Sequence, residues 1–243
     1  MSKQLVIIPT YNEIENIQAI IEAVLHLPEK FHILVVDDNS PDGTSSVVQT
    51  LMNKVFTDQL FLLQREKKKG LGTAYIDGFK WALANGYDFI FEMDADFSHS
   101  PDDLSLLLNV LKGEEGQVAI GSRYVKGVNV VNWPMKRILM SWFASKYVKF
   151  ITGLPINDAT AGFVGFRREV LQKINLDKVK FIGYAFQIEM KFKAYKLGFN
   201  VVEIPVIFTD RRKGKSKMNG SIIWEAIFGV LKLKVKSIFG KIQ

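Results

Sequence analysis

The sequence predicts an α/β protein with a mostly parallel central sheet and helices on both of its faces. Short apolar runs alternate with helical patterns through most of the 243 residues, which is typical of successive βαβ units. Residues 88–93 are almost wholly apolar and lie between Gly86 and Asp94, as expected for a central strand buried on both faces. Several of these runs end in polar turns, and open α/β sheets bind ligands at the carboxyl ends of their strands.

The elements follow in chain order. The expected strands are residues 4–8, 31–36, 59–64, 88–93, 117–121, a short strand after 163, and 200–208. The expected helices begin near Asn12, Thr44 and Ser100, or span 72–85, 134–152, 184–197 and 221–239. Asn12-Glu13-Ile14-Glu15 has the pattern of a capping box, and Ser100-Pro101-Asp102-Asp103 has the residues of a helix start. We expect one α/β domain, of the size of a catalytic domain, over residues 1–215 and a basic, apolar C-terminal helix over residues 216–243.

Composition narrows the class of protein. Hydrophobic residues make up 48% of the chain and charged residues 23%, as in a folded globular protein. The absence of cysteine excludes disulfides and thiolate metal sites. The first residues enter a strand directly, without a basic segment and a long apolar run, so we expect no signal peptide and a cytoplasmic location. No uncharged apolar run reaches about 18 residues, so we expect no membrane-spanning helix.

The net charge of +7 favours anionic partners. Residues 134–152 and 221–239 interleave lysines with aromatic and aliphatic residues, as helices at a membrane surface do. We therefore expect a peripheral membrane protein. The alternative is that both helices pack on the sheet and that their lysines are simply solvated. Nucleic acid is not an expected partner, because the basic stretches contain no reading helix or base-stacking platform.

Two carboxylates, Asp94 and Asp96, follow the strand at 88–93. A pair of carboxylates one residue apart suits a hard divalent cation that keeps several waters and is completed by substrate phosphates. The alternative is that this acidic loop only caps the next helix. Asp102 and Asp103 already serve that helix start, so the metal interpretation is favoured.

Four polar loops follow predicted parallel strands: 9–13, 37–44, 94–101 and 121–124. A doubly wound sheet would bring them to one edge. An aromatic ring at Tyr11 can stack on a base, Glu13 or Asp38 can accept hydrogen bonds from a base or ribose, and Arg123 can bind a phosphate with two N–H groups. Together these groups indicate a nucleoside diphosphate site. Taken singly, Asp37 and Asp38 could cap a turn and Tyr11 could belong to the core.

Two motifs of other nucleotide-binding proteins are incomplete in this sequence. Gly70-Leu71-Gly72 begins like a dinucleotide-binding fingerprint, but Tyr75 stands where the third glycine belongs and the loop does not open the first βαβ unit. Gly214-Lys215-Ser216 lacks the earlier glycine of a phosphate-binding loop, because Thr209 stands there. His99 lies near the acidic loop, where a single histidine is typical of local hydrogen bonding, and we assign it no role.

The loops, taken in order, resemble those of polyprenol (dolichyl) phosphate mannose synthases. The residues that carry the resemblance are 9–13, 37–44, 94–101 and 121–124, and it extends through 158–168, 184–189 and 211–217. These enzymes are glycosyltransferases of family 2 with a GT-A fold, a Rossmann-like and mostly parallel sheet with flanking helices. The resemblance implies an inverting hexosyltransferase of the dolichyl-phosphate β-mannosyltransferase type, which moves mannose from GDP-mannose to a polyprenyl phosphate with Mg²⁺ or Mn²⁺.

The resemblance also implies roles for individual residues. Asp94 and Asp96 of the DXD motif would bind the metal, and Asp94, Ala95 and Asp96 would hold the pyrophosphate. Arg123 would act in catalysis by binding phosphate. The remaining nucleotide-sugar contacts would be Pro9, Tyr11, Glu13, Val36, Asp38, Arg211 and Lys217. Some relatives carry C-terminal transmembrane segments or act with membrane subunits. This sequence resembles the short form of these enzymes, without transmembrane segments.

Three other interpretations stay open from the sequence. The donor could be UDP-glucose or another nucleotide sugar, because a few pocket residues set base and sugar choice. The chain could be a catalytically silent nucleotide- or membrane-binding subunit, although the complete set of charged site residues argues against this. A nicotinamide oxidoreductase is a distant third. A phosphate acceptor is already an anion, so the expected reaction needs no general base, only positioning and charge stabilisation.

Overall fold

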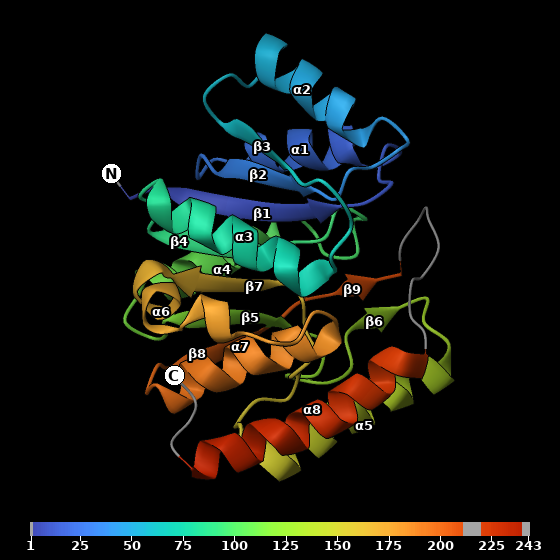
Figure 1. The fold of residues 1–243 in the computed structure, drawn as a ribbon, viewed down its shortest axis with the longest axis vertical. Helices are drawn as coiled ribbons and strands as arrows, with labels where there is room; N and C mark the ends of the chain where they lie inside the picture. The colour runs from blue at the N-terminus through green and yellow to red at the C-terminus, as the bar shows by residue number, and fades with distance from the viewer. Residues whose placement is uncertain (1, 211–219, 240–243) are drawn as a thin grey trace.

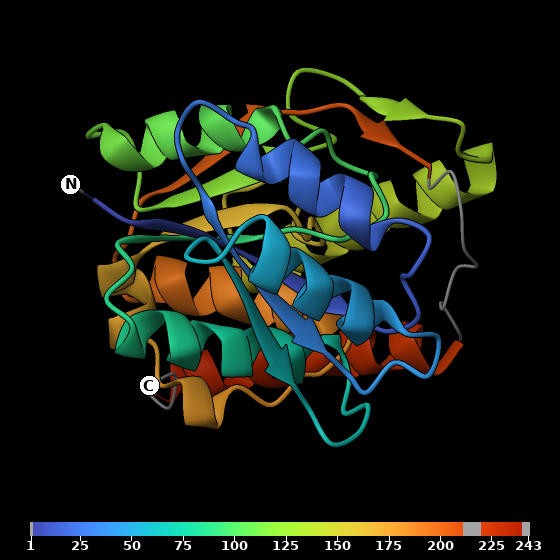
Figure 2. The same ribbon diagram turned by 90° about the horizontal axis from the view of Figure 1, so that it is seen from above.

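The computed structural model describes residues 2–210 and 220–239, and its centre is a seven-stranded sheet with strand order β3-β2-β1-β4-β7-β5-β8 (Figure 1). The strands are β1 (Gln4–Thr10), β2 (His32–Asp37), β3 (Leu60–Gln64), β4 (Phe89–Glu92), β5 (Val118–Ser122), β7 (Val164–Arg167) and β8 (Val201–Pro205). A separate two-stranded ribbon pairs β6 (Val130–Val131) with β9 (Phe208–Thr209). Figure 2 shows this ribbon beyond the main sheet, near the start of α5.

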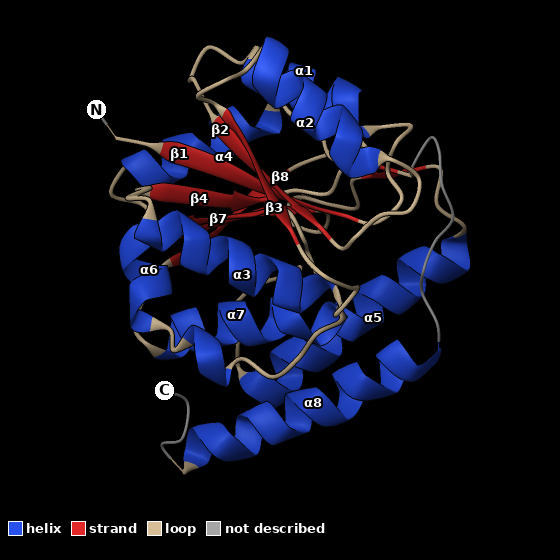
Figure 3. Ribbon diagram, turned by 45° about the horizontal axis from the view of Figure 1, so that its top comes forward, coloured by secondary structure: helices blue, strands red, loops and turns tan. Residues whose placement is uncertain are grey.

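Helices cover both faces of the sheet. They are α1 (Ile17–Leu25), α2 (Thr44–Lys54), α3 (Leu71–Ala84), α4 (Asp103–Lys112), α5 (Met135–Thr152), α6 (Arg168–Lys173), α7 (Tyr184–Lys196) and α8 (Gly220–Ile238), with a 3₁₀ turn at Leu176–Lys178. In Figure 3, α1, α2 and α4 lie on one side of the strands, and α3, α6 and α7 lie on the other. The mostly parallel sheet with flanking helices is therefore confirmed.

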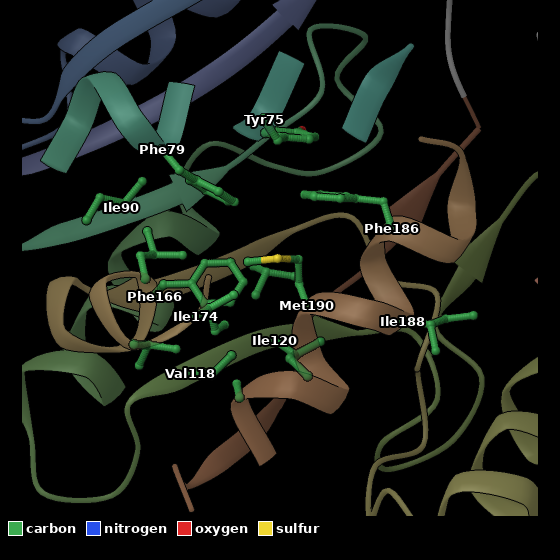
Figure 4. Close-up of a cluster of buried hydrophobic side chains, with 14 of the residues drawn as sticks. Tyr75, Phe79, Ile90, Val118, Ile120, Phe166, Ile174, Phe186, Ile188 and Met190 are labelled. Carbon is green, nitrogen blue, oxygen red and sulfur yellow. The ribbon is translucent and has the colours of Figure 1, made fainter. Parts of the chain in front are cut away.

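Alternation along the strands builds the two halves of the core. Leu5 and Ile7 of β1 pack with α3 and α7, whereas Val6 and Ile8 pack with α1 and α4. All four side chains are fully buried, which explains why the strand reads as a continuous apolar run. Figure 4 shows the larger cluster, in which Phe79 of α3 and Phe166 of β7 meet edge to face at 5.6 Å between ring centroids.

Strand β7 runs against its neighbours. It pairs antiparallel with β4 and with β5. The other neighbouring strands pair in parallel: β3 with β2, β2 with β1, β1 with β4, and β5 with β8. Gly165 of β7 lies opposite Phe91, and a Cβ at this glycine would lie 2.7 Å from the Phe91 ring. The alternation of apolar runs carries no information on strand direction, so the sequence places this short strand without its orientation.

Two helix starts differ from the sequence prediction. Helix α1 begins at Ile17 rather than near Asn12, whose φ of 59° is left-handed. The backbone N–H of Asn12 donates to Ser40 Oγ at 3.0 Å, and that of Glu13 donates to Thr44 Oγ1 at 3.0 Å. Asn12 and Glu13 thus join two loops by hydrogen bonds, in place of the expected capping box. Helix α4 begins at Asp103, after a turn at Pro101 and Asp102.

Helix α8 lies along α5 and beside α7 (Figure 1). Val230 and Leu233 are buried in the core cluster, and the Tyr147 hydroxyl of α5 donates to the Ile227 carbonyl at 3.0 Å. The described part of the C-terminal segment therefore packs on the folded domain. The division at residue 215 stays a prediction. Within residues 2–210 and 220–239, every helix is too short or too polar to cross a bilayer.

Candidate active site

The first two predicted loops meet at the carboxyl ends of β1 and β2. Pro9 is in register with Val36, and Thr10 is in register with Asp37. The Asp38 backbone N–H then donates to the Thr10 carbonyl at 3.0 Å. The parallel pairing of β1 and β2 thus brings all five predicted guanosine-pocket residues to one edge of the sheet.

The two neighbouring acids of the second loop do different things. Asp37 is fully buried and caps the turn: it accepts hydrogen bonds from Thr10 Oγ1 at 2.8 Å and from Ser40 Oγ at 2.6 Å. Asp38 pairs with Arg65, Oδ1 to Nη1, at 2.9 Å. Burial raises the pKa of Asp38, and Arg65 opposes that shift. Asp37 is therefore structural, whereas Asp38 is the carboxylate paired at the predicted base pocket.

Tyr11 lies partly exposed beside this pocket rather than in the core. The Lys68 ammonium lies 4.1 Å from the centroid of its ring, a cation–π contact that leaves the residue at the surface. Pro9 and Glu13 are also partly exposed, whereas the Val36 side chain is fully buried in the core beneath α3. The contact of each of these residues with a nucleotide stays a prediction.

The acidic loop leaves β4 directly. Asp94 is partly exposed, Ala95 and Asp96 are buried, and Asp96 Oδ1 accepts the Ser98 backbone N–H at 3.1 Å. Phe97 holds the turn with a left-handed φ of 57°. In the described part of the chain no group of three or more histidine or acidic side chains is placed to hold a metal ion. Two carboxylates fit a divalent cation whose remaining ligands are water and substrate phosphate.

Arg123 is held by a buried ion pair. Its Nε donates to Asp158 Oδ2 at 2.7 Å, its Nη2 donates to Asp158 Oδ1 at 2.6 Å, and Nη2 also donates to Thr160 Oγ1 at 2.8 Å. Arg123 is 7% exposed and Asp158 is fully buried. Burial by itself would raise the pKa of Asp158, but Arg123 lowers it below its ordinary value. The sequence prediction of a phosphate-binding arginine did not include this partner.

The loop that carries Asp158 is fixed from two further elements. Glu203 of β8 accepts the backbone N–H groups of Asn157 at 2.7 Å and Asp158 at 2.8 Å. The fully buried Lys191 of α7 donates to the Ala159 carbonyl at 3.1 Å and to the Ala161 carbonyl at 2.5 Å. In the sequence, Lys191 lies among apolar residues of a predicted helix, which was the available signal for a buried lysine. The helical pattern alone does not predict which carbonyls it contacts.

One cavity of about 460 Å³ joins the predicted catalytic residues to the paired helices α5 and α8. Asp94, Asp96 and Arg123 line its polar part, and side chains of α5 and α8 line its apolar part. Several residues of its wall had no predicted role: His99, Trp133, Arg137, Thr160 and Gln187. The Arg137 guanidinium lies 3.9 Å from the Trp133 ring centroid and its Nη1 pairs with Asp210 at 2.9 Å.

His99 is the histidine nearest to the acids. It is 5% exposed and stacks on Phe163 with 4.8 Å between ring centroids. Burial, with a smaller effect of Arg123, lowers its pKa to about 4. The imidazole is therefore neutral near pH 7. The predicted phosphate ligands Arg211 and Lys217 lie outside the described residues.

The comparisons with known proteins identify the family. Residues 5–175 match the family model described as glycosyl transferase family 2. A polyprenol monophosphomannose synthase of Mycolicibacterium smegmatis is 49% identical over 94% of this chain and 85% of its own. An undecaprenyl-phosphate mannosyltransferase of Micrococcus luteus is 42% identical over 93% of this chain and 91% of its own.

Solved structures with low sequence identity share the fold. A glucosyl-3-phosphoglycerate synthase from Mycobacterium tuberculosis, solved with Mn²⁺, UDP-glucose and phosphoglyceric acid, aligns with a TM-score of 0.69 at 15% identity, over 96% of this chain and 79% of that one. A mannosyltransferase from Pyrobaculum calidifontis, solved with GDP-Man and Mn²⁺, aligns with a TM-score of 0.58 at 17% identity, over 98% and 74%. Both alignments support the predicted GT-A fold.

Proposed function

The chain belongs to glycosyltransferase family 2, and from this premise we propose that it transfers mannose from GDP-mannose to a polyprenyl phosphate and releases GDP. The observation that carries the proposal is the single cavity that has carboxylates and Arg123 at one end and the apolar helices α5 and α8 at the other. A transferase that joins a nucleotide sugar to a lipid phosphate needs both environments at one reaction centre.

The donor occupies the carboxyl ends of β1, β2 and β4. Tyr11 and Asp38 flank the base, with Pro9, Glu13 and Val36 forming the rest of the guanosine pocket. Asp94 and Asp96 hold a divalent cation, Mg²⁺ or Mn²⁺, which supplies positive charge beside the diphosphate. The P. calidifontis neighbour, which has the same fold, was solved with GDP-Man and Mn²⁺ together. This supports the proposed binding of a nucleotide sugar and a divalent cation at one site.

The acceptor phosphate enters from the apolar end. Its oxygen forms a bond to the anomeric carbon of mannose while the bond from that carbon to the diphosphate breaks, with inversion. Arg123 lines the cavity, and in this proposal it lies between the two anionic substrates, where its positive charge lowers their repulsion. The Asp158 and Thr160 contacts hold the guanidinium in one orientation before substrates bind. Arg211 and Lys217 provide further phosphate contacts.

The lipid chain lies along α5 and α8, and the enzyme sits on the membrane surface. Exposed apolar side chains gather on these two helices: Met135, Leu139, Met140, Phe143, Phe150, Phe228, Leu231, Val235 and Ile238 are each at least 42% exposed. Lysines of the same helices lie among them, and each lysine near an anionic surface contributes about 1 kcal/mol. We therefore place the protein peripherally on the cytoplasmic face of the membrane.

Transfer of label tests the donor and the metal together. Purified protein is incubated with polyprenyl phosphate, Mg²⁺ or Mn²⁺, and either GDP-[¹⁴C]mannose or UDP-[¹⁴C]glucose, and organic-extractable label is counted. We expect label from GDP-mannose that EDTA abolishes. Label from UDP-glucose alone would overturn the sugar assignment, and label from neither donor with folded protein would overturn the proposed activity.

A further inference from the structure

Gln187 is a buried amide in the wall of the candidate active site. It lies in the first turn of α7 and is 2% exposed. Its neighbours fix the helix against α3: the Phe186 ring stacks on Tyr75 at 5.9 Å between centroids, with an interplanar angle of 5° (Figure 4). Gln187 and Tyr75 line the same cavity as Asp94 and Asp96. The position of the Gln187 backbone is thus determined by packing that does not depend on its own side chain.

The Gln187 amide forms no hydrogen bond of normal geometry with a described residue, at either its oxygen or its nitrogen, and its nearest polar neighbour is the Glu92 carboxyl. It lies close to the Glu92 carboxyl, in an arrangement that gives neither group a hydrogen bond of normal geometry. A buried amide without a partner costs roughly 1–3 kcal/mol of stability. The Glu92 carboxyl can use at most one donor and one acceptor of the amide, and a ligand in the cavity can use the others.

The chemistry of the amide selects a hydroxyl-bearing ligand. A primary amide donates and accepts hydrogen bonds, as does a sugar hydroxyl. A phosphate only accepts, and cations such as Arg123 and Arg137 already line the cavity for it. The apolar lipid chain has no group that forms a hydrogen bond with an amide. Asp94 and Thr160 line the same cavity as Gln187 and belong to its polar part, where a hexose attached to the diphosphate would lie.

We propose that Gln187 binds a hydroxyl group of the donor hexose and is a specificity-determining residue for the sugar. This inference rests on the proposed function and adds the contact that distinguishes the nucleotide sugar from the nucleotide alone. It makes a prediction that a structural role does not: removal of the amide weakens binding of GDP-mannose but leaves binding of GDP unchanged.

The test is calorimetric titration of GDP and of GDP-mannose into wild-type protein and Gln187→Met, with Mn²⁺ and without acceptor. Methionine keeps the length and volume of the side chain and removes both polar atoms. Loss of a hydrogen bond to one or two hydroxyls weakens GDP-mannose binding about tenfold, whereas the GDP dissociation constant changes less than about twofold. Gln49→Met on the exposed surface of α2 is the control and changes none of these quantities.

The outcomes separate this inference from the proposed function. Equal GDP-mannose affinities of variant and wild type, or equal losses for GDP and GDP-mannose, would overturn the role of Gln187 and leave the proposed function standing. Wild-type protein that binds neither ligand would overturn the proposed function itself. If Gln187→Met does not fold, Gln187→Leu is measured in its place, with the same split expected, and failure of both to fold would show that the residue is structural.

Discussion

Asp158 fixes the charge that the site presents to its substrates. Its carboxylate accepts two side-chain hydrogen bonds and one backbone hydrogen bond from Arg123, at 2.6–2.9 Å. Asp158→Ala would leave a guanidinium 7% exposed without its counter-ion, which costs about 3–5 kcal/mol of the free energy of unfolding. Urea denaturation measures this loss. The exposed Asp58→Ala is the control and should change stability by less than about 1 kcal/mol; similar losses in both variants would contradict the account.

Asp96 is expected to matter for activity rather than for folding. Its carboxylate accepts the backbone N–H of Ser98 and lines the cavity. We predict that Asp96→Ala lowers the rate of label transfer at least about a hundredfold, because the charge on the departing diphosphate is no longer balanced. Circular dichroism should show a folded protein. A variant with the wild-type rate would exclude Asp96 as a metal ligand.

His99 makes stability depend on pH in a defined window. The folded-state pKa of His99 is lowered to about 4 from 6.5, mainly by burial, so the unfolded state binds the proton more tightly. Stability is unaffected above pH 6.5 and falls as the pH drops from there toward 4; at pH 5 the loss is about 2 kcal/mol. His99→Gln should reduce the difference in unfolding free energy between pH 7.5 and pH 5 by this amount. The exposed His26→Gln should not, and an unchanged difference in the His99 variant would contradict the assignment.

Helices α5 and α8 form the surface that we assign to the membrane. Phe143 is 60% exposed and Phe150 is 87% exposed. Replacement of both by serine should lower the bound fraction in flotation with anionic phospholipid vesicles by more than about tenfold, since each buried phenylalanine contributes about 1.5–3 kcal/mol. Val55→Ser is the matched control, because Val55 is 61% exposed at the end of α2, far along the sheet from α5 (Figure 1). Unimpaired flotation of the double variant would refute this membrane surface.

The elements that the sequence located best are those with strong apolar runs. Strands β1, β2 and β4 and helices α3, α5 and α7 match their expected ranges closely, because buried strands and long helices leave clear patterns. The short α6 and the two-residue strands β6 and β9 were not foreseen. They are too short to show periodicity, and β6 and β9 pair across a long stretch of sequence.

Across the whole molecule, the motif residues were predictable and their partners were not. Asp38, Asp94, Asp96 and Arg123 all lie at one edge of the sheet or in one cavity wall, because parallel strands end together. Arg65, which pairs with Asp38, and Asp158, which pairs with Arg123, come from other elements. The first pair depends on the register of β2 with β3, and the second depends on the packing of α7 and β8 against the loop that carries Asp158. No local pattern specifies either.

The central claim is that this cavity brings a nucleotide-bound mannose to a lipid phosphate. The most direct measurement compares initial rates of label transfer from GDP-[¹⁴C]mannose to polyprenyl phosphate and to the unphosphorylated polyprenol of the same length, with the same metal and detergent. A phosphate acceptor is already an anion and needs no general base, and Arg123 favours an anion, so only the phosphate should be labelled. Equal labelling of both lipids, or of neither, would contradict the account.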